Sequence, residues 1–163
     1  ACGMMRRAIN EGQHLLELCE NDNLGVRYQL MHLYVFMEDE MHALALHKQF
    51  DSYEETQMLL PLAVLYYKLN QFDKAEDYIK RLAKVNKGAK KFLRAAARDQ
   101  LYDYMDEMSP YGYQPFTMEE LLDELLSASY LFDSVPYFFP WASKALAAKT
   151  SAKKGAGKPK LLH

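Results

Sequence analysis

The sequence predicts an all-α protein assembled from helix–turn–helix units. Only seven glycines and six prolines occur in 163 residues, half of which are hydrophobic, and this composition is typical of a folded domain. Apolar side chains recur at spacings of three and four along most of the chain, as they do on one face of a helix. A shift of 32 positions also brings like residues into register, which indicates an internal repeat. The matched pairs are Leu30 and Leu62, Tyr34 and Tyr66, and Ala43 and Ala75.

The first predicted helix spans residues 4–20. Its apolar stripe includes Ile9 and Leu16, and the cluster Asn21-Asp22-Asn23 ends it and offers side-chain caps to the next helix. This helix has no partner in the repeat pattern. We expect either that the chain is a fragment of a longer array, which is the preferred explanation, or that the helix is an N-terminal cap.

The two repeat units are predicted at residues 24–50 and 52–87, each as a pair of helices. In the second unit the helices join at Asn70-Gln71, and the first of them is apolar almost all round, which predicts burial on two sides. Pro61 removes one backbone hydrogen bond from that helix and should kink it. The second helix keeps its apolar residues on one face: Ala75, Tyr78, Ile79, Leu82 and Val85.

A third group of helices is predicted over residues 89–148. One helix should run from Ala89 to Met108, with a loop rich in tyrosine and proline over residues 109–116. The chain breaks again at Val135-Pro136. Together with the repeats, these helices form a single domain that ends near Ala148.

Side-chain patterns mark the starts of several helices. Ser52 and Glu55 have the spacing of a capping box, in which two side chains satisfy each other's backbone N–H groups, and so do Thr117 and Glu120. Pro140 is predicted to lie in the first turn of the last helix, where it costs no backbone hydrogen bond.

The second unit resembles a tetratricopeptide repeat, whose signature combines a large residue, a Leu-small pair, a tyrosine and an aromatic-Asp-x-Ala turn. The closing proline of the signature is replaced by Lys87, and the first unit departs further, with Met31 and Glu40 at signature positions. The resemblance implies stacked helix pairs in a short right-handed solenoid with C-terminal capping helices. The signature residues here are Leu59, Leu62-Ala63, Tyr66 and Phe72-Asp73-Lys74-Ala75.

The order of these elements is similar to that of a bacterial family of tetratricopeptide-like proteins, distantly related to the suppressor-of-tumorigenicity-7 type. The resemblance covers residues 15–148. It rests on the repeats, the Tyr/Pro loop and an aromatic-Pro-Trp stretch at Phe139-Pro140-Trp141. It implies a binding scaffold with no assigned chemistry. From the sequence as a whole we expect a cytoplasmic module that binds a protein or peptide.

The repeat register predicts where a partner would bind, because the first helix of each pair lines a concave groove in stacked repeats. Most of the groove positions are aromatic or aliphatic, which suits an amphipathic helix or an extended peptide. Tyr67 and Phe36 are the preferred ligand contacts. The alternative is that the chain's own last helices, residues 121–146, fill the groove. The groove positions are Tyr28, His32, Val35, Phe36, Gln57, Leu60, Val64, Tyr67 and Lys68.

Basic residues gather in two places and suggest a second function, an adaptor for an acidic partner or a nucleic acid. Residues of the first group recur at spacings of four and three. We expect this group to be either an ordinary solvated face or a strip that docks an acidic partner. The other is a lysine-rich tail over residues 149–163, predicted to be disordered, with binding of nucleic acid as the alternative. Residues 1–143, by contrast, carry a net charge of −8. The basic strip consists of Lys80, Lys84, Lys87, Lys91, Arg94 and Arg98.

No sequence motif of known chemistry is present, which favours a non-enzymatic protein without metal or cofactor. The carboxylates Asp103, Asp106 and Glu107 share a helix face, but a solvated surface is the preferred interpretation over a cation site. The histidines are expected to be surface or packed residues instead of ligands. They include His14, His32, His42 and His47.

The cysteines and the hydropathy pattern bear on the cellular compartment. Cys2 and Cys19 lie at opposite ends of one predicted helix, roughly 25 Å apart, which is too far for a disulfide. Free thiols fit a reducing compartment. No apolar run reaches the ~18 residues of a membrane span, so no membrane partner is expected. Nine methionines and the unpartnered first helix make self-association plausible.

Overall fold

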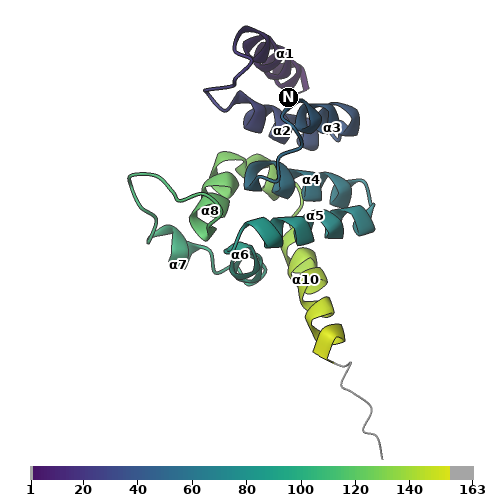
Figure 1. The fold of residues 1–163 in the computed structure, drawn as a ribbon, viewed down its shortest axis with the longest axis vertical. Helices are drawn as coiled ribbons and strands as arrows, with labels where there is room; N and C mark the ends of the chain where they lie inside the picture. The colour runs from purple at the N-terminus through teal and green to yellow at the C-terminus, as the bar shows by residue number, and fades with distance from the viewer. Residues whose placement is uncertain (1, 155–163) are drawn as a thin grey trace, which may run out of the picture.

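The computed structural model describes residues 2–154, with side chains for residues 3–148, and this part of the chain contains ten helices and no strand (Figure 1). The all-α prediction is confirmed. The first five helices are α1 (Cys2–Leu18), α2 (Val26–Phe36), α3 (Glu40–Gln49), α4 (Thr56–Lys68) and α5 (Phe72–Val85). The others are α6 (Ala89–Ala96), α7 (Tyr102–Met105), α8 (Met118–Ser127), α9 (Ser129–Asp133) and α10 (Phe138–Lys154).

Helix α4 is the centre of the molecule. It packs against α2 and α3, α5, and α8, and every residue from Met58 to Tyr66 is buried. This explains the apolar character of α4 on all sides, as the sequence predicted. The helix continues through Pro61 as one element, and the kink expected there remains a prediction.

The turns that end α2 and α4 have the same backbone geometry, 32 positions apart. Glu38 and Asn70 both adopt the left-handed conformation, with φ of 58° and 57°. In each turn the next residue donates its N–H to the carbonyl five positions back, at 2.8 Å onto Tyr34 and 2.9 Å onto Tyr66. This arrangement is the Schellman motif. The turns that end α3 and α6 contain the same kind of bond, from Ser52 to His47 and from Gln100 to Ala95, so this geometry is a common helix end in the chain.

The predicted cap at Asp22 is confirmed. Its carboxylate accepts the N–H groups of Val26 at 2.7 Å and Arg27 at 3.1 Å, which satisfies two free donors at the start of α2. Glycine at position 25 has a φ of 67° and directs the chain from this cap into the helix.

Both predicted capping boxes are wrong. Ser52 has a φ of 51° and belongs to the turn that ends α3, so α4 starts only at Thr56. The Thr117 hydroxyl donates to the Gln114 carbonyl at 2.6 Å instead of capping α8. Glu120 is drawn into a buried network, because tertiary partners outweigh the local pattern.

The single helix predicted from Ala89 to Met108 is also wrong. The chain leaves α6 through Asp99, which has a φ of 56°, and re-enters helix only for the single turn of α7. Aspartate adopts the left-handed conformation more readily than most residues. The turn brings Leu101 into the core, where it is 9% exposed.

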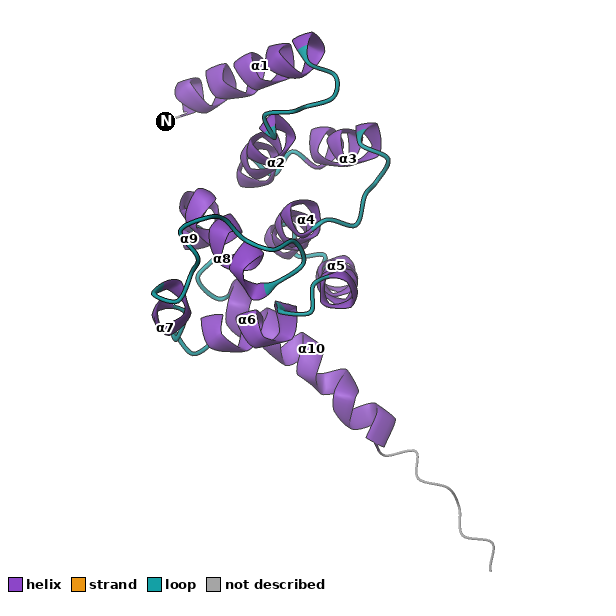
Figure 2. Cartoon of the chain, turned by 60° about the vertical axis from the view of Figure 1, so that its left-hand side comes forward, coloured by secondary structure: helices purple, strands orange, loops and turns teal. Residues whose placement is uncertain are grey.

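The C-terminal helices fold back onto the N-terminal ones (Figure 2). Helix α8 packs on α4 and α6, α9 on α2, and α10 on α5 and α6. Gly88 permits the close approach of α8, since a Cβ there would lie 2.3 Å from the Met118 nitrogen. Pro140 lies in the first turn of α10, as predicted.

Helix α10 continues to Lys154, past the predicted end of the folded domain at Ala148. The remainder of the predicted tail, residues 155–163, lies outside the described residues. No helix within residues 2–154 has both the length and the apolar character that crossing a membrane requires.

Candidate binding surfaces

The predicted concave groove is filled by the C-terminal helices. Leu60 and Val64 are fully buried, as is Val35. The ring of Phe36 contacts Tyr130 of α9, with 5.5 Å between ring centroids. Of the two alternatives raised by the sequence, the structure therefore has the filled groove, and these side chains belong to the core.

Tyr67, a preferred ligand contact, lies in an aromatic cluster that joins α4 to α5 and α10. Its ring centroid is 5.7 Å from that of Phe72, 5.4 Å from that of Phe138 and 5.2 Å from that of Trp141. Tilted and edge-on rings at these distances attract one another beyond their burial. The cluster holds α10 against the N-terminal helices.

His32 pairs with a carboxylate of α8 at the base of the filled groove. Its Nε2 atom lies 2.5 Å from Oε1 of Glu124, and the two side chains are only 4% and 3% exposed. Burial raises the pKa of the Glu124 carboxyl, while the contact with His32 acts in the opposite direction. His32 therefore has a structural partner and does not face an open site.

Helix α8 carries a second buried carboxylate, Glu120, one helical turn before Glu124. Oε2 of Glu120 accepts hydrogen bonds from the Thr56 hydroxyl at 2.6 Å and from the Phe116 N–H at 2.8 Å. The Asn86 amide donates to the Thr56 oxygen at 3.0 Å and to the Thr117 carbonyl at 2.9 Å. These polar groups satisfy one another, as buried groups normally do, and they tie α8 to α4 and the end of α5.

Lys68 also has a structural role. Its Nζ atom donates to the carbonyls of Phe36 at 2.7 Å and Val35 at 3.3 Å, at the end of α2. It lies 5.1 Å from the centre of the Phe36 ring, and burial lowers the pKa of its ammonium group. A lysine held at a helix C-terminus satisfies carbonyls that lack partners within the helix.

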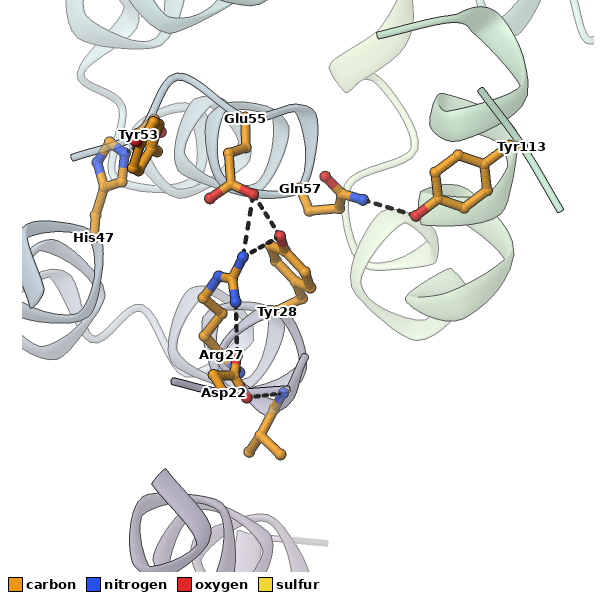
Figure 3. Close-up of polar contacts among 9 residues, drawn as sticks. Asp22, Arg27, Tyr28, His47, Tyr53, Glu55, Gln57 and Tyr113 are labelled. Carbon is orange, nitrogen blue, oxygen red and sulfur yellow. Dashed lines mark hydrogen bonds and ion pairs between the residues drawn. The ribbon is translucent and has the colours of Figure 1, made fainter. Parts of the chain in front are cut away.

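Tyr28 belongs to a polar cluster between α2 and the segment before α4 (Figure 3). Its hydroxyl donates to Glu55, and the guanidinium of Arg27 bridges Glu55 and Asp22, with 2.9 Å to the latter. Burial and the bond to Glu55 raise the pKa of Tyr28. Figure 3 also shows Gln57 donating to the hydroxyl of Tyr113, at 3.0 Å. This cluster connects α2 to the start of α4, and Gln57 connects α4 to the loop before α8.

A hollow lies between α1 and α3, above α2, and the sequence did not predict it. Its volume is about 710 Å³. Apolar and polar residues share its lining, which includes Tyr34, whose hydroxyl accepts a 2.7 Å hydrogen bond from Gln13 and whose ring stacks on His42. Ten residues line the hollow: Gln13, Leu16, Glu17, Glu20, Leu30, Tyr34, His42, Ala45, Leu46 and Gln49.

An equivalent hollow of about 460 Å³ lies between α3 and α5. Tyr66 lies in its lining, 32 positions after Tyr34. The Nζ atom of Lys74 lies 4.9 Å from the centre of the Tyr66 ring, and His42 occupies the corresponding place beside Tyr34. The repeated tyrosine was a sequence signal for these hollows. What it could not indicate is the spacing between neighbouring helices, which sets their size.

The predicted basic strip does not form one stripe on a helix. Lys80 and Lys84 belong to α5 and Lys91 and Arg94 to α6, and the two helices run in different directions (Figures 1 and 2). Lys80 is paired with Glu76 at 2.6 Å. Lys91 lies 4.4 Å from the centre of the Tyr104 ring. The other members, Lys87 and Arg98, lie in the connections that follow α5 and α6.

The remaining candidate ligands are scattered. His42 contacts Asp39 at 2.7 Å, and His47 contacts the backbone oxygen of Tyr53 at 2.8 Å (Figure 3). Asp103 and its neighbours Asp106 and Glu107 are exposed. Within the described side chains, no group of three or more histidines, cysteines or carboxylates is arranged to hold a metal ion.

Comparison of the chain with protein-family models, with curated proteins and with solved structures gives no match in any of the three.

Proposed function

We propose that the chain is a tetratricopeptide-like module that binds a partner protein and carries out no chemistry itself. The repeated Schellman turns at Glu38 and Asn70 support the repeat architecture. The proposed binding site is the hollow between α1 and α3, not the concave groove of the sequence prediction, because α8–α10 occupy that groove. The single observation that carries the proposal is the size of this hollow, whose lining combines leucines with acidic and amide side chains.

The chemistry of the hollow favours an apolar side chain of a peptide or helix as the ligand. Its volume of about 710 Å³ lies within the range of about 300–1,000 Å³ found for binding pockets. Leu16, Leu30 and Leu46 supply the apolar part of a lining that also contains amide and acidic side chains. The rim carries Glu17 and Glu20 but no lysine or arginine among its lining residues, so a partner with basic residues beside its apolar anchor fits best.

The test is selection of binding peptides followed by a matched pair of arginine substitutions. Peptides selected from a displayed library on the full chain should shift the NMR signals of α1–α3. Ala45→Arg, on the lining, should weaken their binding at least about tenfold, because the long side chain occupies the hollow. Ala8→Arg, at an exposed position of α1 outside the lining, should change it less than about twofold. Peptides that map elsewhere, or bind both variants equally well, would contradict the proposal.

A second candidate function is an adaptor for an acidic partner. It is favoured by the cations around α6, for which the described part of the chain supplies no carboxylate. Three partly buried cations before α6, Arg27, Lys68 and Arg81, are paired with acids, whereas the exposed Lys48 and Lys84 form no ion pair among the described residues.

A further inference from the structure

A small groove between α6 and α10 has basic residues beside an apolar floor. Its volume is about 250 Å³, below the usual size of a small-molecule pocket, so it suits an anchoring side chain of a larger partner. We call it the basic groove. It is lined by Lys90, Leu93, Arg94, Ser143, Leu146 and Ala147.

The charges of the basic groove are not neutralised within the described structure. Lys90 and Arg94 are exposed, and no described carboxylate lies within ion-pair distance of either one. Exposed Lys87 and Lys144 nearby in the sequence are likewise without an acidic partner among the described residues. The chain as a whole has a net charge of −2, so this is a local positive surface on a protein with a slight excess of acids.

The spacing of the two cations matches a helical partner. Lys90 and Arg94 are four positions apart on α6, about 6 Å along the helix axis. Two carboxylates one turn apart on a partner helix can pair with both. Between the rim charges, Leu146 and Ala147 offer apolar surface for a side chain from the same partner, above the buried Leu93.

The apolar floor favours a protein over a nucleic acid. Proteins that bind single strands without sequence preference stack the bases on exposed aromatic rings, and no aromatic side chain lines this groove. Trp141, the single tryptophan of the sequence, lies in α10 and packs against Tyr67 and Phe72. We propose that the basic groove docks an acidic amphipathic segment of a partner protein, with an apolar side chain on Leu146 and carboxylates on Lys90 and Arg94.

The probe for this proposal is a labelled helical peptide of about 16 residues, with leucines at spacings of three and four and glutamates beside them. Two control peptides replace every glutamate by glutamine or every leucine by alanine. Fluorescence anisotropy on the full chain should give the tightest binding for the parent peptide, by at least about tenfold over either control. Equal binding of the glutamine peptide, or tighter binding of an oligothymidylate of equal charge, would overturn the proposal.

Matched variants locate the site. Lys90→Glu/Arg94→Glu should weaken binding of the parent peptide at least about tenfold, and Ala147→Trp, which adds bulk without charge, should weaken it as well. The control variant Arg6→Glu/Lys48→Glu makes the same change in net charge at two exposed positions on other helices. Its effect on the logarithm of the affinity should be less than about a third of the effect of Lys90→Glu/Arg94→Glu. A control as damaging as the groove variant would overturn the assignment. Ala45→Arg should leave this binding unchanged, so the two proposed surfaces succeed or fail separately.

Discussion

Replacing His32 by alanine is expected to lower the free energy of unfolding by about 3–5 kcal/mol at pH 7. The reason is that Glu124, 3% exposed and 2.5 Å from the imidazole, would lose its partner and remain buried. Urea denaturation followed by far-UV circular dichroism measures the loss. The double variant His32→Leu/Glu124→Leu removes both polar groups at once and should lie within about 1.5 kcal/mol of the parent. A double variant as unstable as His32→Ala would show that the pairing is not the cause.

The same pair sets a dependence of stability on pH. Because burial raises the pKa of Glu124, the folded chain holds this proton more tightly than the unfolded chain does. At pH values between the ordinary glutamate pKa of 4.5 and the raised pKa of Glu124, unfolding releases this proton. The contribution of Glu124 to the free energy of unfolding therefore falls as the pH rises through that window. Glu124→Gln should remove this fall. The loss in free energy of unfolding caused by His32→Ala should become smaller at low pH, because protonation of Glu124 removes the buried charge.

Tyr67→Ala is expected to lower the free energy of unfolding by about 2–4 kcal/mol. The substitution removes the ring that contacts Phe72, Phe138 and Trp141 and so loosens α10 from α4 and α5. Thermal and urea denaturation give the magnitude. Tyr137→Ala is the matched control, because this tyrosine immediately precedes α10 and is 76% exposed, and its effect should stay within about 0.5 kcal/mol.

This result also distinguishes a core residue from a ligand contact. If Tyr67 lined an open groove, Tyr67→Ala would weaken partner binding and leave stability close to that of Tyr137→Ala. A loss confined to binding would therefore contradict the aromatic cluster as described.

Helices α2–α5 were predictable because their signals are local. Apolar residues on all sides of α4 indicated burial on more than one face, and the turn at Asn70-Gln71 was evident from the break in periodicity. Pro140 in the first turn of α10 follows from its missing N–H. Asp99 shows the limit of such reasoning, since its left-handed conformation ends α6 without any glycine or proline to mark it.

The binding surfaces depend on contacts between distant parts of the chain. Glu120 and Glu124 lie in an acidic block that favours a solvated face, yet both are buried, because Thr56 and His32 meet them from 64 and 92 positions away. No local pattern encodes such partners. The hollow between α1 and α3 depends likewise on how far apart two helices lie, which neither helix specifies alone.

Native-state hydrogen exchange most directly tests whether α8–α10 are a permanent part of the core. If the concave face is sealed as described, the most protected amides of α8 should exchange with the same free energy of opening as those of α4, close to the global free energy of unfolding. The contrary result would be that the amides of α8–α10 exchange with a lower free energy of opening while those of α2 and α4 stay protected. In that case the concave face can be uncovered, and Phe36 and Tyr67 return as candidates for binding a partner.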